Sequence, residues 1–532
     1  MEARARDFRF CRFLLFMKLR PYLTLAITIC CIASAEDKSS LVALLNASED
    51  QLEKLYAEYW RADWQATKGH SQASTAAIRS RILSAVSEPA LLNVLRSVRF
   101  DDPLLDRRRE LFLQEYAADV IEGDAELARI VESISHQQSE IRFRVGNQRL
   151  TRAQLEDRLA TGADRAGRRA AWEAQEQAAA TFGGTVKQAI RRRNALSPRY
   201  TGAKYADATL ERKGLSRTAL AGWFEEIHTG TEAAYQSLLK QIRGQLGIQT
   251  VEPWDLDYYL GQMSRDVDWR VLGAGGAWTK VKRFALSLGF DFGRLPVELK
   301  TTDMAFGGAT YPILYGRDVK MLVNRSRGIR FTETLLHETG HALHYSLDQE
   351  PSFLLRAGYS ETFDEGLGQV MALMLYEPPI ASGYFGLTAS QTNALRDRQR
   401  LQSLIELREY MADSLFELTL YDNPDQDLAR AYNDIYSKYL GVDLHGREVW
   451  TYDPFYGTDP IYLQNYVLAD MMARQVHRYL HDHFGTVWDE GAGDFLQDKL
   501  YSHGGRFTLD QIMEQSTGRP LTPRDLIAAF GL

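Results

Sequence analysis

Apolar residues recur every three or four positions through most of the first half of this 532-residue chain. Segments rich in Ala, Glu, Arg and Leu carry this spacing from about residue 36 to residue 248, and few Pro or Gly residues interrupt them. A stripe with a period of 3.6 residues is typical of an amphipathic helix that packs on a core. We therefore expect this half of the chain to be almost wholly helical, without internal repeats or low-complexity linkers.

The pattern changes to that of β-strands between residues 304 and 324. The runs 308–314 and 319–323 flank a turn at 315–318, Tyr-Gly-Arg-Asp. This arrangement predicts a β-hairpin directly before the next helix. Gly307 and Gly308 have no side chains, so another backbone could approach this edge closely.

The helical spacing returns at residues 332–345, which contain H-E-x-x-H. On a helix, His337 and His341 are one turn apart and share a face, so both imidazoles can reach one ion. Zinc suits such a pair, and a catalytic zinc keeps three protein ligands and a fourth position for water. Glu338 would lie beside that water as a general base. Thr332 is the expected N-cap. The competing interpretation is a buried helix with two hydrogen-bonded histidines.

A third ligand would favour the metal site. His344 is unsuitable, because ligands at residues 337, 341 and 344 would spread over roughly 10 Å of helix rise. Residue 347, where metzincins carry their third histidine, is Leu347. A second predicted helix follows a loop with Pro351 and Gly358, and it can fold back antiparallel to offer a carboxylate. The residues alone leave both Glu365 and Glu361, one turn earlier, as candidates.

A tyrosine pair marks the last informative stretch. Asp459 followed by Pro460 is typical of an N-cap and the first helical position, so the helix would place Tyr462 and Tyr466 on one face. A phenol stays protonated near neutral pH and can donate to a developing oxyanion. For Tyr466, and likewise for Tyr456 upstream, the alternative is a core tyrosine. His477 and His481 share the same i, i+4 spacing as the zinc pair, but no carboxylate partner is evident for a second metal.

The segments H-E-T-G-H-A-L-H, at 337–344, and F-D-E-G-L-G-Q-V-M-A-L, at 363–373, resemble the angiotensin-converting-enzyme (peptidyl-dipeptidase A) family of gluzincin metallopeptidases. The related thimet oligopeptidases share much of this pattern. The resemblance covers nearly all of the mature chain and is sharp from about residue 307 to residue 475. It implies one zinc ion per chain, with Glu365, 28 residues after His337, as the third ligand.

The resemblance also implies how a peptide binds. Gly308, Ala309 and Thr310 lie where the family's edge strand pairs with the substrate backbone, which gives affinity independent of sequence. Tyr466 takes the place of the family's transition-state tyrosine, and Tyr456 that of a second donor. Tyr462 could donate to the terminal carboxylate of the substrate.

Three residues depart from the family pattern. Gln369 replaces an aspartate that orients a zinc histidine, and its amide can still accept the ring N–H but carries no charge. Asn465 replaces the arginine that binds chloride, so chloride activation is not expected. Pro454 lies near the position of the family's carboxylate-binding lysine, so strict release of dipeptides does not follow from the resemblance.

The first 35 residues are typical of a signal peptide. A basic segment precedes an apolar stretch at 22–32, and Ala33-Ser34-Ala35 forms an A-x-A cleavage site, although Met17 is an alternative start. The apolar stretch is too short to span a bilayer. All cysteines of the chain, Cys11, Cys30 and Cys31, lie in this leader, so the mature protein would have no disulfides. An exported protein without disulfides favours a bacterial periplasm over a disulfide-rich extracellular setting.

Charge narrows the range of partners. The leader carries six basic and two acidic side chains, so its removal takes the formal net charge of the chain from −7 to −11. An acidic protein of this kind is not expected to bind nucleic acid or an anionic membrane by bulk charge.

We therefore predict a mainly α, two-lobed gluzincin with a deep central cleft and a small β-hairpin beside the zinc helix. One catalytic domain would span residues 36–532, with a helical lobe at about 36–250 and the zinc-bearing part at about 251–532. The expected activity is the hydrolysis of short peptides, with release of C-terminal dipeptides as the leading form. The alternatives are a broader oligopeptidase and a non-catalytic peptide-binding protein on the same fold.

Overall fold

A computed structural model describes residues 38–68, 75–263, 269–273, 275–302, 304, 307–325, 329–452 and 455–531. The predicted signal peptide and its cleavage site lie outside the described residues, as does Pro454.

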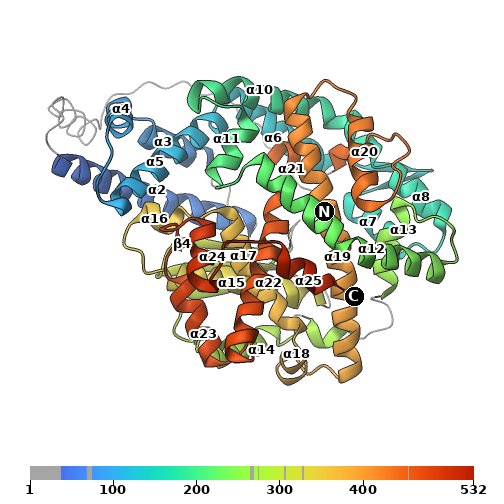
Figure 1. Ribbon diagram of the computed structural model, residues 1–532. Coiled ribbons are helices and arrows are strands. Elements are labelled where there is room, and N and C mark those ends of the chain that lie inside the picture. Colours follow the sequence, from blue (N-terminus) through green and yellow to red (C-terminus); the bar gives the residue numbers. More distant parts are fainter. Residues whose placement is uncertain are drawn as a thin grey trace.

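Helices dominate both halves of the described chain (Figure 1). Those of the first half are α2 (Lys38–Thr67), α3 (Thr75–Val86), α4 (Pro89–Ser97), α5 (Pro103–Glu122), α6 (Ala125–Glu140), α7 (Arg152–Thr161), α8 (Arg165–Glu173), α9 (Glu176–Ala178), α10 (Gly184–Tyr200), α11 (Tyr205–Arg212), α12 (Arg217–Leu246), α13 (Pro253–Met263) and α14 (Ala277–Ser287). Those of the second half are α15 (Ile329–Leu347), α16 (Phe353–Ala357), α17 (Glu361–Leu373), α18 (Pro378–Gly383), α19 (Ala389–Asp422), α20 (Leu428–Leu440), α21 (Phe455–Thr458), α22 (Gln464–Phe484), α23 (Glu490–Leu496), α24 (Leu509–Thr517) and α25 (Arg524–Phe530).

Short 3-10 or π turns link some of these helices: η1 (Ala179–Gly183), η2 (Trp269–Leu272), η3 (Met374–Tyr376), η4 (Trp450–Tyr452) and η5 (Gln497–Tyr501). The prediction of a mainly α fold is confirmed. The prediction that the first half is helical holds except for a small antiparallel hairpin of β1 (Phe143–Val145) and β2 (Gln148–Leu150), which the helical spacing did not reveal.

A three-stranded sheet precedes α15. The predicted hairpin is present as β4 (Gly308–Leu314) and β5 (Asp318–Asn324), which pair antiparallel around a turn in which Gly316 has φ +68°. A third strand, β3 (Val297–Thr302), pairs parallel with β5, so the order is β3-β5-β4 and β4 is an edge strand. The hairpin prediction is confirmed, but the sheet has one strand more than the sequence indicated.

Helix α17 lies at the centre of the second half, where it packs against both α15 and α22. The α17–α22 contact is close, because a Cβ at Gly366 would lie 2.3 Å from the sulfur of Met472. In Figure 1, α15, α17 and α22 lie together near the middle of the molecule, with β4 beside them. This arrangement brings segments from residues 308, 337, 365 and 466 to one place.

Two helix boundaries differ from the prediction. Helix α15 begins at Ile329 rather than after Thr332, whose hydroxyl is buried and donates to the carbonyl oxygen of Leu272. Helix α22 begins at Gln464 rather than at Pro460, because Ile461 has φ +55°, a left-handed conformation that interrupts a helix. Thr332 and Asp459 are therefore not the caps that the sequence suggested.

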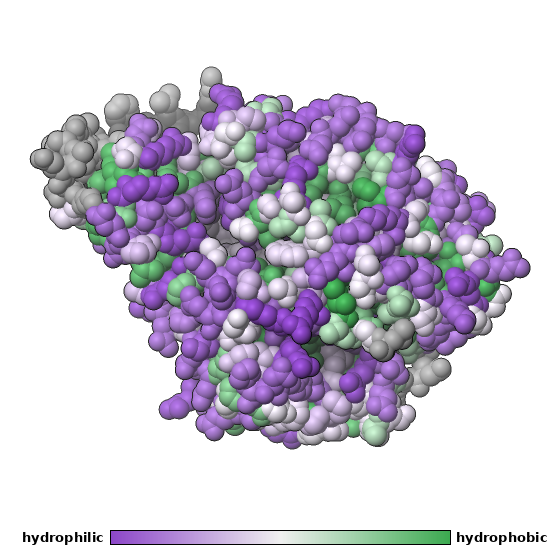
Figure 2. Space-filling model, in the orientation of Figure 1, coloured by the Kyte–Doolittle hydropathy of each residue, from purple (hydrophilic) through white to green (hydrophobic). Residues whose placement is uncertain are grey.

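One continuous hydrophobic core runs through the described chain, with members from Leu44 in α2 to Phe530 in α25. The face seen in Figure 2 is mainly hydrophilic, with apolar side chains in small scattered groups. Among the described residues, no helix combines the length and apolar character needed to cross a bilayer.

Candidate metal centre and active site

Helix α15 presents both predicted histidine ligands to one point. Nε2 of His337 lies 3.0 Å from Nε2 of His341, and Oε2 of Glu365, on α17, lies 3.4 Å from Nε2 of His337. One ligand atom from each of these residues lies within 4.8 Å of the other two. Zinc–ligand distances of about 2.0–2.2 Å in a tetrahedral site separate ligand atoms by roughly 3.3 Å. The three donors therefore fit one zinc ion and leave a fourth position open.

Within the described ranges, no other set of three His, Cys, Asp or Glu side chains converges in this way. His344 is fully buried, and its Nδ1 lies 3.2 Å from Oδ1 of Asp364 instead of facing the centre. The rival ligand Glu361 is engaged elsewhere, because its carboxylate pairs with Lys213 and accepts a hydrogen bond of 2.9 Å from Asn465. The geometry favours Glu365 over both.

Two glycines allow α15 and α17 to approach closely enough to form this set. A Cβ at Gly340 would lie 2.3 Å from the carbonyl oxygen of Leu367. A Cβ at Gly368 would lie 2.6 Å from Cε1 of His337. Both distances are shorter than any real van der Waals contact, so larger residues would force the two helices or the imidazole to move.

Asp364 supports the centre from the other side of His341. Its Oδ1 lies 3.2 Å from Nδ1 of His341, and its Oδ2 accepts a hydrogen bond of 2.7 Å from the hydroxyl of Tyr345. Burial lowers the pKa of His341, but the attraction of Asp364 outweighs this and, with no ion bound, raises the pKa to about 10. Burial likewise opposes the charge on Asp364, yet His341 and His344 hold its pKa well below the usual value.

Sequence reasoning missed Asp364 and placed Gln369 in this role. In the structure, the Gln369 amide makes a long hydrogen bond of 3.5 Å to Oδ1 of Asp470 on α22. The carboxylate next to His341 is that of Asp364, which immediately precedes the ligand Glu365 in sequence. A carboxylate on the far nitrogen of a metal-binding imidazole fixes the tautomer and raises ligand basicity, so the charge missing at residue 369 is supplied at residue 364.

Glu338 lies between α15 and the edge strand. Its side chain is buried, and its Oε2 accepts a hydrogen bond of 2.7 Å from the hydroxyl of Thr310 in β4. A Cβ at Gly308 would lie only 2.7 Å from Cγ and Oε1 of Glu338. Burial raises the pKa of Glu338, while the two neighbouring histidines and Thr310 lower it. A carboxylate held in this way is suited to accept a proton close to the metal.

The structure gives the three predicted strand residues two functions. Gly308 and Thr310 position Glu338, as the contacts above show, and Gly308, Ala309 and Thr310 are half-buried on the edge strand β4. The pairing of a substrate backbone with this edge remains a prediction. It is compatible with β4 having only β5 as its neighbour in the sheet.

Tyr462 contacts one of the metal ligands directly. Its hydroxyl donates a hydrogen bond of 2.6 Å to Oε1 of Glu365, and burial together with this carboxylate raises the pKa of Tyr462 far above the usual value. The phenol therefore stays protonated and orients the third ligand, in place of the free substrate donor that we expected. Tyr466 packs beside it, with ring centroids 5.6 Å apart, and lies 5.0 Å from the ring of Tyr410 on α19. Its role as a transition-state donor remains a prediction.

Tyr456 lies in a different environment. Its side chain is fully buried, and its hydroxyl donates a hydrogen bond of 3.1 Å to Oδ1 of Asp413. Its ring packs at 5.6 Å from Phe416 and 6.3 Å from Trp450. These contacts are those of a core tyrosine, which is the alternative that the sequence left open for this residue.

Comparisons with known proteins identify the fold. No protein-family model and no curated protein sequence matches the chain. Solved structures do match: the metallocarboxypeptidase 1 of Trypanosoma cruzi has a TM-score of 0.61 at 14% identity, covering 91% of this chain and 99% of that one. The M32 carboxypeptidase of Deinococcus radiodurans R1 has a TM-score of 0.62 at 15% identity, covering 92% and 97%. The chain therefore has the fold of these metallocarboxypeptidases over nearly its whole length.

This likeness refines the resemblance found in the sequence. It supports a metallopeptidase fold, within which the His-His-Glu set of this chain converges. The structural neighbours are carboxypeptidases, so they do not single out the angiotensin-converting-enzyme family that the motifs suggested. At this identity, the likeness concerns the fold alone.

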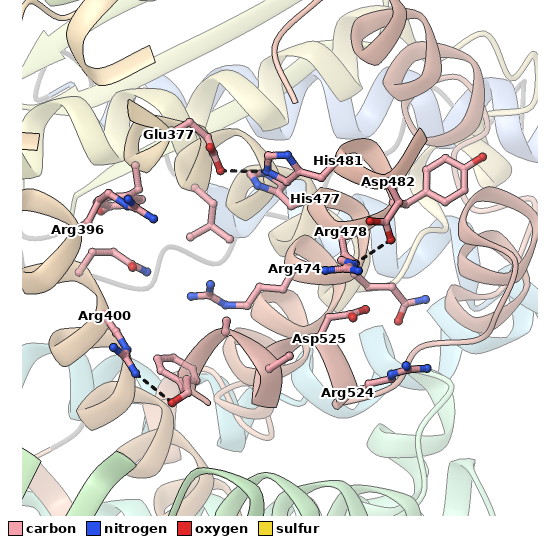
Figure 3. A pocket seen from close by; sticks show the side chains of 18 of the residues that line it. Glu377, Arg396, Arg400, Arg474, His477, Arg478, His481, Asp482, Arg524 and Asp525 are labelled. Atoms are coloured by element: carbon pink, nitrogen blue, oxygen red, sulfur yellow. Dashed lines mark hydrogen bonds and ion pairs between the residues drawn. The ribbon is translucent and has the colours of Figure 1, made fainter. Parts of the chain in front are cut away.

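A cavity of about 1130 Å³ lies beyond the ligand set, between α19, α22 and α25 (Figure 3). Arginines and histidines gather around it, among them Arg396, Arg400, Arg474, Arg478, Arg524, His477 and His481. Nε2 of His477 lies 2.8 Å from the carbonyl oxygen of Val370, and Nε2 of His481 lies 3.3 Å from Glu377. These two histidines thus have separate partners and do not form a second metal site.

Proposed function

We propose that this protein is a zinc-dependent metallopeptidase that hydrolyses short peptides near their carboxyl end. The observation that carries the proposal is the convergence of His337, His341 and Glu365 with Glu338 held beside them by Thr310. A zinc ion bound by these ligands would polarise a peptide carbonyl and lower the pKa of a coordinated water. The likeness to metallocarboxypeptidases over more than nine-tenths of the chain supports the same assignment.

Each neighbouring residue has a defined part in this reaction. The edge of β4 binds the substrate backbone and aligns the scissile bond with the centre. Glu338 accepts a proton from the attacking water at its carboxylate and then donates it to the nitrogen of the leaving amine. The phenol of Tyr466 donates to the oxyanion that develops from the carbonyl oxygen. Asp364 and Tyr462 hold His341 and Glu365 in place.

The C-terminal fragment that the enzyme releases contains one or two residues. The motifs resemble those of peptidyl dipeptidases, whereas the structural neighbours are carboxypeptidases by name. Both activities use the same ligand set and general base, and they differ in how far from the metal the terminal carboxylate is held. A single experiment can therefore test the proposal and measure the product length.

In this experiment, the zinc-loaded protein is incubated with short peptides that have free carboxyl ends, and the products are identified by mass spectrometry. We expect C-terminal fragments of one or two residues, which disappear in Glu338→Gln at equal zinc content. Absence of hydrolysis by zinc-loaded protein would contradict the proposal. Retained peptide binding in calorimetry would then indicate the alternative, a non-catalytic peptide-binding protein.

We further propose that the protein is exported and that the mature chain begins at Glu36. The proposal rests on the basic segment, the apolar stretch and the A-x-A site of the first 35 residues. N-terminal sequencing of the protein from its native host should give Glu36. Soluble cytosolic protein that retains Met1 or Met17 would contradict it.

A further inference from the structure

A cavity of about 320 Å³ opens directly beside the metal ligands. His337 and Glu338 of α15 and Gly308 of β4 form part of its lining. The lining continues with residues of α17, η3 and α19, which are Gln369, Ala372, Leu373, Tyr376, Gln399, Gln402, Ser403 and Glu406. A peptide aligned with β4, with a carbonyl at the centre, would therefore place a side chain next to the scissile bond at the mouth of this cavity.

The lining is polar and carries negative charge. Among the described residues, its carboxylates besides the catalytic Glu338 are Glu333 and Glu406, and no Lys or Arg lines it. Amides and hydroxyls supply most of the remaining lining, and few apolar side chains are present. Such a lining is unsuited to a large hydrophobic side chain, because its polar groups would lose their contacts with water.

The two carboxylates differ in their partners. Glu333 is already compensated, because it accepts a hydrogen bond from the hydroxyl of Tyr376 and lies 3.5 Å from the buried guanidinium of Arg398. Glu406 accepts a hydrogen bond of 2.7 Å from the Gln402 amide, and no cation lies within ion-pair distance of it among the described residues. Burial and the charge of Glu333 raise the pKa of Glu406, and the Gln402 amide and the more distant charges of Arg330 and Arg398 only partly offset this.

The geometry points to a specificity pocket for a cationic side chain: the cavity takes a Lys or Arg of the substrate next to the scissile bond, and Glu406 binds its charge. This inference rests on the proposed peptidase function. A long flexible side chain can pass His337 and Glu338 and reach α19, where the ammonium or guanidinium group meets the Glu406 carboxylate. A charge-assisted hydrogen bond in such a site favours the charged side chain over a neutral one by about tenfold or more.

The test uses peptides of one alanine-based frame in which the residue on either side of the cleaved bond is Lys, Arg, Gln, Leu or Glu. We expect kcat/KM for Lys or Arg on one side of the bond to exceed that for Gln by about tenfold or more. Glu406→Gln should reduce this Lys-to-Gln ratio by a similar factor. Glu406→Lys should reverse the preference and favour Glu.

Glu409→Gln is the matched control. Glu409, like Glu406, is a half-buried carboxylate and lies one turn further along α19, but it does not line the cavity. The control variant should keep the Lys-to-Gln ratio of the wild type. Hydrolysis without a preference for cationic side chains, or equal loss of the ratio in Glu406→Gln and Glu409→Gln, would overturn the inference and leave the peptidase function standing. Absence of any hydrolysis by the zinc-loaded wild type would overturn both.

Discussion

Oδ1 of Asp364 lies 3.2 Å from Nδ1 of His341, while Nε2 of the same imidazole faces His337 across the ligand set. Asp364 and Glu365 are adjacent on α17, so one helical turn supplies both a metal ligand and the carboxylate that orients another ligand. A carboxylate on Nδ1 keeps the proton on that nitrogen and leaves Nε2 free to bind the ion. The short α15–α17 separation at Gly340 and Gly368 makes this arrangement possible.

We predict that Asp364→Asn lowers zinc affinity by about 10–100-fold, because an amide cannot supply the charge that raises the basicity of His341. Competition of the protein with a fluorescent zinc chelator measures this change directly. Since Asp364 also accepts from Tyr345, thermal unfolding of the metal-free variant should be recorded to separate loss of affinity from loss of folded protein.

Gln369→Ala is the control for this prediction, because the Gln369 amide has only a long contact with Asp470. Its zinc affinity should change much less than that of Asp364→Asn. The opposite order of effects would show that residue 369 orients the histidine after all, as the sequence suggested.

Glu338→Gln should keep its zinc and lose about 10²–10⁴-fold in kcat, because the substitution removes the general base and leaves the three ligands intact. Metal content by atomic absorption and turnover of a short peptide should be measured on the same sample. Substantial activity in the zinc-loaded variant would refute the role of Glu338.

Glu361→Ala tests the rejected ligand. It should retain zinc, because the Glu361 carboxylate contacts Lys213 and Asn465 rather than the histidines. It should also lower the free energy of unfolding by about 1–3 kcal/mol, because Lys213 is left buried without a partner. Loss of zinc in folded Glu361→Ala would show that the ligand set has been assigned wrongly.

Thr310→Val should move the acid limb of the pH–activity profile to higher pH. The Thr310 hydroxyl donates to Glu338 and lowers its pKa, so removing this hydrogen bond raises the pKa. A base with a raised pKa becomes protonated, and therefore inactive, at a higher pH than in the wild type. The measurement is kcat/KM against pH, and Thr301→Val on the exposed part of β3 is the control that should leave the limb in place.

The sequence was sufficient for the features that depend on local spacing. Histidines one turn apart on a helix must share a face, and two strand-like runs at 308–314 and 319–323 that flank a short turn are expected to pair as a hairpin. The role of Asp364 could not be found in this way, because it depends on how α17 is rotated against α15. β3 was missed because its apolar–polar alternation, Val-Glu-Leu-Lys at 297–300, is only four residues long, and its pairing with β5 is non-local.

Backbone conformation explains why α22 begins later than the sequence predicts. Asp459-Pro460 is a typical helix start, yet the left-handed Ile461 delays α22 until Gln464. Tyr462 therefore stands before the helix, where its hydroxyl reaches Glu365. A positive φ at a β-branched residue is uncommon, and no sequence pattern signals it. The role of Tyr462 at the metal set thus became apparent only in the three-dimensional structure.

Gly368→Ala should reduce zinc binding, because the new methyl group would lie 2.6 Å from Cε1 of His337 and displace the imidazole. Such overpacking also costs about 1–3 kcal/mol in the free energy of unfolding. Gly244→Ala in α12 is the control, since a Cβ there meets no atom within 4 Å. It should stabilise the helix by about 0.5–1 kcal/mol without affecting zinc. Normal zinc content in Gly368→Ala would show that the two helices can separate without disturbing the site.

The last prediction concerns how strongly the terminal carboxylate of the substrate is bound. Nζ of Lys213 lies 5.3 Å from the ring centroid of Tyr462, which makes Lys213 the cation to consider near the metal ligands. Its side chain is only 3% exposed and is already paired with Glu361, so it is poorly placed to bind a second carboxylate. A charge-assisted hydrogen bond from an unengaged cation would raise the affinity for the terminal carboxylate by about tenfold or more. Amidation of the C-terminus of a short peptide should therefore slow cleavage by less than about tenfold.

Acetylation of the N-terminus of the same peptide serves as the control modification. A decrease in the cleavage rate of about a hundredfold or more on amidation would mean that a cation binds the terminal carboxylate. If Lys213→Met then abolished the difference between the free and amidated peptides, Lys213 would be that cation.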